Sequence, residues 1–236
     1  MNDFLKTFLV QSHRGLCKNQ SIFENTLESI KNAKENGYLS CEVDVRLTKD
    51  GHIVLHHDPD VDNLKIHENN LSSLNSIKSI TLLSDVFSWL NETQNKNFVL
   101  NIEIKSIHYL DIKIINKIIK LALNFKVDKQ IYFSCFNPLN LIYLRFKFPF
   151  FKRALLVTHE LVPGNFSFIR NQKLNFLVKP DYIHLRESDY INGYYKPKKN
   201  EILILWTVNE LDCCFKYKSE GVKGVITDVI TPDKFN

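Results

Sequence analysis

Acidic side chains alternate with apolar ones in two short stretches of the chain. Glu42 and Asp44 are separated by one valine, and Glu103 is followed two residues later by Lys105. Because residues i and i+2 of a strand point to the same side, each pair should project from one face of its strand. Three acids brought together would repel one another unless a cation lies between them. Glu42, Asp44 and Glu103 therefore predict a divalent-cation site whose oxygen ligands suit Mg²⁺ or Ca²⁺ better than zinc.

Basic and histidine side chains extend this chemistry to an anionic substrate. Arg14 offers a planar fork of donors and Lys105 a point charge, so both would be free to hold a phosphate that also touches the cation. Histidine has an unperturbed pKa near ~6.5 and can hold or release a proton at neutral pH. His13 and a histidine of the adjacent pair His56 and His57 can therefore serve as general base and general acid on the two sides of a phosphate.

Apolar runs that alternate with helical patterns predict the scaffold for these side chains. Strands are expected over residues 8–10, 38–47, 98–105, 131–134, 154–157, 182–185, 202–207 and 225–228. Helices are expected over residues 27–34, 82–90, 110–125, 138–146 and 209–219, the first of them capped by Asn25 or Thr26. Eight such strands in 236 residues predict an α/β fold, a TIM (β/α)8 barrel. An open doubly wound sheet is the alternative, but no glycine-rich phosphate loop supports it.

The polar residues of the expected strands stand at the end where a barrel enzyme works. This holds for His13, Asp44, Lys105, Ser134, Thr207 and Asp228, all at or near the carboxyl ends of their strands. The Asp50-Gly51 turn predicts a hairpin into residues 53–55, and the polar stretch 59–80 predicts a short insertion after the second strand. We expect residues 1–236 to form a single domain.

Composition narrows the class of protein and of partner. The formal charge of +5 is spread over 31 basic and 26 acidic residues without a basic block, which favours a solvated surface over a nucleic-acid site. The sequence has no signal-peptide pattern and no apolar run near the ~20 residues of a membrane span, so we expect a cytoplasmic protein without stable membrane insertion. Five cysteines without CxxC spacing favour reduced thiols over disulfides or zinc. The expected partner is a small molecule.

The order of the motifs resembles the glycerophosphodiester phosphodiesterase family. The matching segments are His13-Arg14-Gly15, Glu24-Asn25-Thr26, Glu42-x-Asp44-Val45, Asp50-Gly51, His57-Asp58, Glu103-x-Lys105, Ser134-Cys135-Phe136, Trp206-Thr207-Val208-Asn209 and the stretch from Gly221 to Asp228. This resemblance covers nearly the whole chain. It implies a TIM barrel that hydrolyses glycerophosphodiesters, such as glycerophosphocholine or glycerophosphoethanolamine, to glycerol 3-phosphate and an alcohol.

The resemblance also assigns roles to individual residues. It implies that the divalent metal is bound by Glu42, Asp44 and Glu103, that the acid-base pair is His13 and His57, and that the phosphate contacts are Arg14 and Lys105. The preference for His57 over His56 comes from the family spacing alone. The stretch after Asp58 lacks the arginine and threonines common in the family, which leaves the substrate contacts of that loop open.

Several residues keep two interpretations. Trp206 can form an apolar wall for the glycerol or alcohol part of a substrate, or pack in the core. His184, at the end of an expected strand, can reach the barrel mouth or be a satisfied structural histidine. Glu24 and Asn25 can cap the first helix or contact the active site.

Two alternative functions follow from the same residues. One is a lysophospholipase D-type phosphodiesterase of the same superfamily, which needs an apolar approach to the barrel mouth. Its candidate is an aromatic cluster made of Phe146, Phe148, Phe150 and Phe151, for which core packing is the other interpretation. The second alternative is a barrel that binds phosphodiesters without cleaving them.

Overall fold

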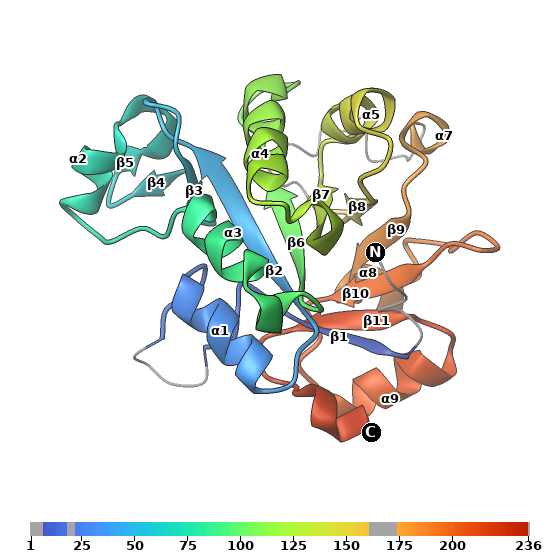
Figure 1. Ribbon diagram of the computed structural model, residues 1–236. Coiled ribbons are helices and arrows are strands. Elements are labelled where there is room, and N and C mark those ends of the chain that lie inside the picture. Colours follow the sequence, from blue (N-terminus) through green and yellow to red (C-terminus); the bar gives the residue numbers. More distant parts are fainter. Residues whose placement is uncertain (1–6, 18–21, 161–173, 236) are drawn as a thin grey trace.

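Figure 1 shows the computed structural model of the chain, in which residues 7–17, 22–160 and 174–235 are described. Its main sheet has nine strands in the order β1-β11-β10-β9-β8-β7-β6-β2-β3. The last of these, β3 (Ile53–Leu55), pairs antiparallel with β2. The others are β1 (Leu9–Ser12), β2 (Ser40–Leu47), β6 (Val99–Ile104), β7 (Ile131–Cys135), β8 (Arg153–Val157), β9 (Tyr182–Arg186), β10 (Leu203–Trp206) and β11 (Gly224–Thr227).

The eight strands other than β3 close into a parallel barrel, because β1 pairs with both β11 and β2. The predicted TIM barrel is confirmed, and the alternative of an open sheet is wrong. All eight expected strands are present. The largest shifts are of two residues: β2 begins two residues later than expected, and β1 runs two residues past the apolar stretch, where Gln11 and Ser12 pair with β11 and Gln11 points into the barrel. There the Gln11 Nε2 donates to Ser40 Oγ at 2.5 Å and to Tyr132 Oη at 3.1 Å.

The expected helices form within two residues of their predicted ends. They are α1 (Leu27–Glu35), α3 (Leu83–Asn91), α4 (Ile112–Asn124), α5 (Pro138–Lys147) and α9 (Leu211–Ser219). Thr26 is the N-cap of α1, since its hydroxyl accepts from Ser29 N while Ser29 Oγ accepts from Thr26 N. The shorter helices α2 (Leu71–Asn75), α7 (Asn175–Val178) and α8 (Glu187–Ile191) were not predicted. Helices of four or five residues carry too little periodic pattern to be read from sequence.

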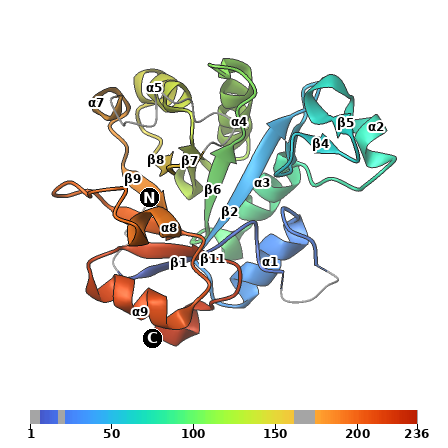
Figure 2. The ribbon, with the colours of Figure 1, turned by 180° about the vertical axis from the view of Figure 1, so that it is seen from behind.

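The predicted insertion between β2 and α3 lies beside the barrel in both views of the molecule (Figure 1, Figure 2). It contains the β2–β3 hairpin, the small sheet of β4 (Asp60–Val61) and β5 (Leu64–Lys65), the 3-10 helix η1 (Ile66–Glu68) and α2. It has a small core of its own, made of Val54, Val61, Ile66, Leu74 and Ile80. Further 3-10 helices are η2 (Thr93–Asn95), η3 (Asp128–Gln130) and η4 (Pro232–Phe235).

Two apolar clusters leave one end of the barrel for polar residues. The larger cluster packs the helices against the outside of the strands, as in the stripe of α4 with Ile115, Ile118 and Ile119. The smaller one fills the inside of the barrel toward the amino ends of the strands and consists of Leu9, Val99, Tyr132, Ala154, Tyr182, Ile204 and Ile226. The side chains that follow on the same faces, such as His13 and Glu103, are therefore collected at the carboxyl ends.

No helix among the described residues is long and apolar enough to span a membrane. Residues 1–6 of the segment considered for a signal peptide lie outside the described part of the chain.

Candidate active site

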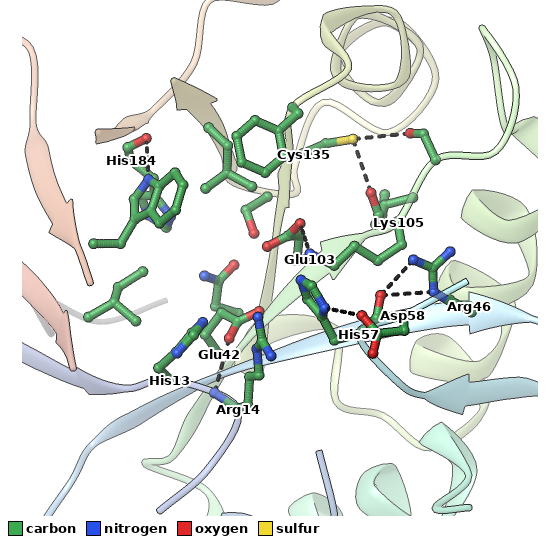
Figure 3. Close-up of a pocket in the computed structure, with 18 of the residues that line it drawn as sticks. His13, Arg14, Glu42, Arg46, His57, Asp58, Glu103, Lys105, Cys135 and His184 are labelled. Atoms are coloured by element: carbon green, nitrogen blue, oxygen red, sulfur yellow. Dashed lines mark hydrogen bonds and ion pairs between the residues drawn. The ribbon is translucent and has the colours of Figure 1, made fainter. Parts of the chain in front are cut away.

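A cavity of about 290 Å³ opens among the carboxyl ends of the barrel strands (Figure 3). The predicted site residues that line it are His13, Arg14, Glu42, His57, Glu103, Lys105 and Trp206, whereas Asp44 is not among its lining residues. In the view of Figure 3, Glu42 and Arg14 lie between His13 and His57. The structure thus brings together, around one cavity, side chains that the sequence spreads over almost 200 residues.

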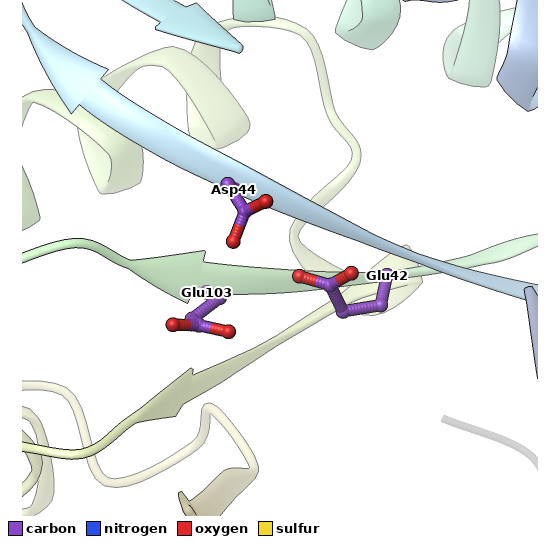
Figure 4. A group of neighbouring side chains, drawn as sticks. All are labelled: Glu42, Asp44 and Glu103. Atoms are coloured by element: carbon purple, nitrogen blue, oxygen red, sulfur yellow. The ribbon is translucent and has the colours of Figure 1, made fainter. Parts of the chain in front are cut away.

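Three carboxyl groups point toward one another from β2 and β6 (Figure 4). Each of Glu42, Asp44 and Glu103 offers an oxygen within 4.8 Å of the others, and all three are buried. The alternation of strand side chains places Glu42 and Asp44 on one face, and the parallel pairing of β2 with β6 sets Asp44 opposite Glu103. The oxygen donors thus converge as the sequence predicted.

The pKa values of two acids of this triad, Glu42 and Asp44, shift in opposite directions. Burial, together with the charges of Asp44 and Glu103, raises the pKa of Glu42 well above its ordinary value. Burial also opposes ionisation of Asp44, but the positive charges of Lys105 and Arg14 outweigh it and lower the pKa of Asp44 to about 2. Ionisation of Glu42 would therefore add a negative charge that Arg14 and Lys105 do not fully offset.

An unpaired oxygen marks where a cation would fit. Glu42 Oε2 accepts from the backbone N of Arg14 at 3.1 Å, while the buried Oε1 has no hydrogen-bond partner among the described residues. A buried carboxylate oxygen without a donor is costly unless a cation or water meets it. The all-oxygen donor set and this free oxygen together fit a hard divalent cation.

Arg14 and Lys105 are paired with carboxylates of the triad. This corrects the expectation that these two side chains would be free to hold a phosphate. Lys105 Nζ lies 2.9 Å from Asp44 Oδ1 and 2.5 Å from Glu103 Oε1. Arg14 Nε lies 3.2 Å from Asp44 Oδ2, and its NH1 donates to Glu24 Oε1 at 2.9 Å. Burial alone would lower the pKa of Lys105, but its two carboxylate neighbours raise it. Lys105 therefore stays charged inside the barrel mouth.

Asn25 supports Asp44 from the loop before α1. Its Nδ2 donates to Asp44 Oδ2 at 2.9 Å, and its Oδ1 accepts from Asp44 N at 2.9 Å. Asn25 has a φ of 56°, in the left-handed region, and its own N donates to the Arg14 carbonyl at 2.8 Å. Thr26 caps the helix, so Asn25 and Glu24 belong to the surroundings of the site and not to the cap.

Each candidate acid-base histidine contacts a carboxylate through Nδ1. His13 Nδ1 lies 2.8 Å from Asp228 Oδ1, and His57 Nδ1 lies 2.8 Å from Asp58 Oδ1. A carboxylate at Nδ1 fixes the ring and leaves Nε2 as the atom that can exchange a proton with a ligand. His56 instead directs its Nδ1 to the carbonyl of Asp58, and it is absent from the described residues that line the cavity.

Arg46 is a site residue that sequence reasoning missed. It is only 8% exposed and lines the cavity. Its Nε and NH2 both donate to the His57 carbonyl oxygen, at 3.1 and 2.6 Å. The available signal was its place two residues after Asp44 on the same face of the strand. Asp58 and Asp228 were named as members of motifs, and Asp228 also as a strand-end residue, but neither was given a role at a histidine.

Two interpretations were open for Trp206, for His184 and for the aromatic cluster, and the structure does not place all of them in the same way. Trp206 lines the cavity, packs edge-on against Phe136 at a ring distance of 5.7 Å and donates its Nε1 to the His184 carbonyl at 3.0 Å. His184 lines the cavity too, and its ring has no hydrogen-bond partner in the described chain, so it is not a satisfied structural histidine. Phe151 is buried, whereas Phe146 and Phe150 are exposed.

The aromatic cluster does not approach the barrel mouth. Phe146, Phe148, Phe150 and Phe151 lie between the end of α5 and the start of β8, which is the amino end of that strand. The cavity lies at the opposite, carboxyl ends of the strands.

The chain is similar to known phosphodiesterases over nearly its whole length. Residues 13–231 match the glycerophosphoryl diester phosphodiesterase family. A glycerophosphodiester phosphodiesterase of Caldanaerobacter subterraneus is 32% identical, with 93% of each chain covered. The solved glycerophosphodiester phosphodiesterase of Thermotoga maritima has 28% identity and a TM-score of 0.71, covering 93% of this chain and 94% of that one.

A further solved structure shares the fold. It is a phosphodiesterase of Oleispira antarctica in complex with the product sn-glycerol-3-phosphate, with 20% identity, a TM-score of 0.73 and 93% and 92% of the two chains covered. The resemblance inferred from the motifs is confirmed: the chain belongs to the glycerophosphoryl diester phosphodiesterase family.

Proposed function

We propose that this enzyme hydrolyses glycerophosphodiesters, such as glycerophosphocholine and glycerophosphoethanolamine, to glycerol 3-phosphate and an alcohol with a divalent cation, Mg²⁺ or Ca²⁺. The observation that carries the proposal is that the acidic triad meets His13 and His57: Glu42, Glu103 and both histidines line one cavity, and Asp44 joins the two glutamates in the triad. Membership of the family and the sn-glycerol-3-phosphate held by the Oleispira antarctica phosphodiesterase support the choice of substrate.

Glu42, Asp44 and Glu103 are the residues that would hold the cation. The unpaired Glu42 Oε1 and the raised pKa of Glu42 both indicate a missing positive charge. When bound, such a cation would act as a Lewis acid and offset the charge of the phosphodiester.

Arg14 and Lys105 are the proposed phosphate contacts. Arg14 keeps a fork of donors, of which Nε and NH1 meet Asp44 and Glu24. Lys105 carries three donors, two of which can meet Asp44 and Glu103. Each side chain therefore has donor capacity left for phosphate oxygens, and charge-assisted hydrogen bonds to those oxygens would stabilise the transition state.

His13 and His57 are the proposed proton carriers. One Nε2 removes a proton from the nucleophile, which is either water or the hydroxyl of the substrate next to the ester oxygen. Attack by that hydroxyl forms a cyclic phosphate, which water must then open to give glycerol 3-phosphate. The other Nε2, already protonated, gives its proton to the departing alkoxide oxygen as the bond from phosphorus to that oxygen breaks. Asp228 and Asp58 each lie 2.8 Å from the Nδ1 of one ring, which would leave the Nε2 of both rings for this transfer.

Trp206 is the proposed apolar wall for the organic part of the substrate. Its ring lies beside Phe136 and its indole N–H is already used by the His184 carbonyl, so it offers the cavity carbon surface without an unpaired donor.

The lysophospholipase D-type alternative has no support from the aromatic cluster. That cluster lies at the amino end of β8, away from the cavity, so it cannot guide an acyl chain to the site.

The proposal is tested by following glycerol 3-phosphate release from glycerophosphocholine in Mg²⁺, in Ca²⁺ and in EDTA. We expect release with at least one of the cations and a loss of release in EDTA. Undiminished turnover in EDTA would remove the cation from the proposal. Lysophosphatidylcholine as a parallel substrate separates the two phosphodiesterase activities, since faster release of choline from it would favour the alternative.

A further inference from the structure

Three polar side chains of the cavity have no part in the proposed cleavage of the phosphodiester. Asn101, Ser134 and His184 each line the cavity, and each is 0% exposed. Atoms without a hydrogen-bond partner in the described chain are Asn101 Oδ1, Ser134 Oγ and both ring nitrogens of His184. Buried polar atoms are nearly always satisfied, so four such atoms around one cavity indicate that something polar meets them there.

The backbone and ring of His184 are held in place although its nitrogens are unpaired. The ring stands perpendicular to the ring of Tyr132 with centroids 6.0 Å apart. The carbonyl of His184 accepts from Trp206 Nε1 at 3.0 Å, and β9 pairs the residue with Leu156 and Ile204 on the neighbouring strands. This fixed ring lines the cavity, and neither of its nitrogens has a hydrogen-bond partner among the described residues.

The surroundings of His184 select a neutral partner. Burial lowers the pKa of His184 to about 3, so the imidazole is uncharged and offers one donor and one acceptor. Ser134 adds a hydroxyl and Asn101 a carbonyl oxygen, and the neighbouring lining residues Leu156 and Ile226 are apolar. This set matches an alcohol hydroxyl, which both donates and accepts, and it offers no charge to a phosphate or an ammonium group.

We propose that His184, with Ser134 and Asn101, forms a subsite that binds the terminal hydroxyl of the substrate's glycerol. The proposal rests on the proposed function, and it adds which part of the substrate enters the buried part of the cavity. Glycerol is the part that all glycerophosphodiesters share, whereas the alcohol varies in size and charge. A closed, neutral subsite suits the constant part, and the variable alcohol then extends toward the solvent.

The test compares two substrates that differ at one atom. One is sn-glycero-3-phosphoethanolamine, and the other is the same ester with hydrogen in place of the terminal hydroxyl. We expect the native enzyme to favour the first by at least ~10-fold in kcat/KM, because the second leaves buried polar groups unpaired. In His184→Leu the ratio should fall to within about twofold of one. His52→Leu is the matched control: it makes the same change at an exposed histidine that does not line the cavity, so the ratio should stay near the native value.

Binding of the products gives an independent measure. Glycerol 3-phosphate and its analogue without the terminal hydroxyl should show the same preference in Kd, again lost in His184→Leu. If the native enzyme cleaves neither ester, the proposed function fails, and the ratio of the two Kd values alone then decides the subsite. Equal kcat/KM and equal Kd for each pair in the native enzyme, or a preference kept in a folded His184→Leu protein, would overturn the subsite and leave a buried water as the partner of His184.

Discussion

His13 Nδ1 lies 2.8 Å from Asp228 Oδ1, although 215 residues separate them along the chain. The contact is possible because β1 pairs in register with β11 in the closed barrel, which brings the ends of the first and last strands together. Asn209 holds the same aspartate, donating to its Oδ2 at 2.8 Å and accepting from its N at 2.9 Å. Burial opposes ionisation, yet the hydrogen bonds from His13 and Asn209 lower the pKa of Asp228, so it is an anion at neutral pH.

Replacing this anion should impair catalysis with little effect on substrate affinity. In Asp228→Asn an amide replaces the carboxylate at His13 Nδ1 and cannot hold the ring in the same way, so we expect kcat to fall at least ~10-fold. Steady-state kinetics with glycerophosphocholine measure the change. Asp233→Asn, which removes an exposed acid of η4, is the control and should have native kcat. A native kcat in Asp228→Asn would show that His13 does not depend on its carboxylate.

Replacing His13 or His57 should lower kcat far more than replacing Asp228. His13→Ala and His57→Ala each remove a proton carrier, and we expect kcat to fall at least ~10²-fold in both. His56→Ala is the matched control, because His56 directs its Nδ1 to the Asp58 carbonyl and not to the cavity. Loss of activity in His56→Ala with native activity in His57→Ala would assign the proton carrier to His56 instead of His57.

Arg46 should act on His57 through the backbone. In Arg46→Ala the His57 carbonyl loses both of its donors, so the turn that carries the imidazole is no longer fixed. We expect kcat to fall about 10-fold with a smaller change in KM, because the lost contact positions a proton carrier and does not touch substrate. Arg46→Lys keeps one donor and should recover part of kcat. A fall in melting temperature without any change in kcat would mean that Arg46 serves stability alone.

Cation binding should depend on pH through Glu42. Its pKa is raised, so in the free site Glu42 gains a proton as the pH falls through that value, and a cation must then displace this proton to bind. We therefore expect the affinity for Mg²⁺ or Ca²⁺ to fall on acidification, by up to about tenfold for each pH unit below the raised pKa. Calorimetric titration of the native protein at several pH values measures this.

Glu42→Gln is the control for that titration. The amide keeps the shape of the side chain and cannot take up the proton, so the variant should bind cations weakly at every pH. A rise in melting temperature on adding the cation gives a second readout, since a ligand at about 100 times its Kd stabilises the folded state by roughly 2.7 kcal/mol. An affinity that does not change with pH would place the cation away from Glu42.

The sequence allowed the triad to be predicted because it depends on local rules. Side chains i and i+2 share a face, so Glu42 with Asp44 and Glu103 with Lys105 could be placed once the strands were recognised. The ion pairs that Lys105 and Arg14 form with the triad could not be predicted, because whether Lys105 meets Asp44 or a substrate depends on the distance between two strands. The contact of His13 with Asp228 depends on the closure of the barrel. The side-chain hydrogen bonds of Gln11 to Ser40 and Tyr132 join three strands inside the barrel, and no local pattern reveals them.

The buried His184 should make the protein sensitive to acid. Its pKa is about 3 in the folded state and 6.5 as the ordinary value, so the unfolded chain binds the proton more readily. The resulting destabilisation is absent above pH 6.5 and grows as the pH falls toward 3, by up to about 1.4 kcal/mol for each pH unit. In His184→Leu this contribution disappears. Chemical denaturation of both proteins at pH 7.5 and 4.5 measures their unfolding free energies. On going from pH 7.5 to pH 4.5, the His184→Leu protein should become more stable relative to the native protein. An equal difference at both values would mean that His184 gains its proton without unfolding.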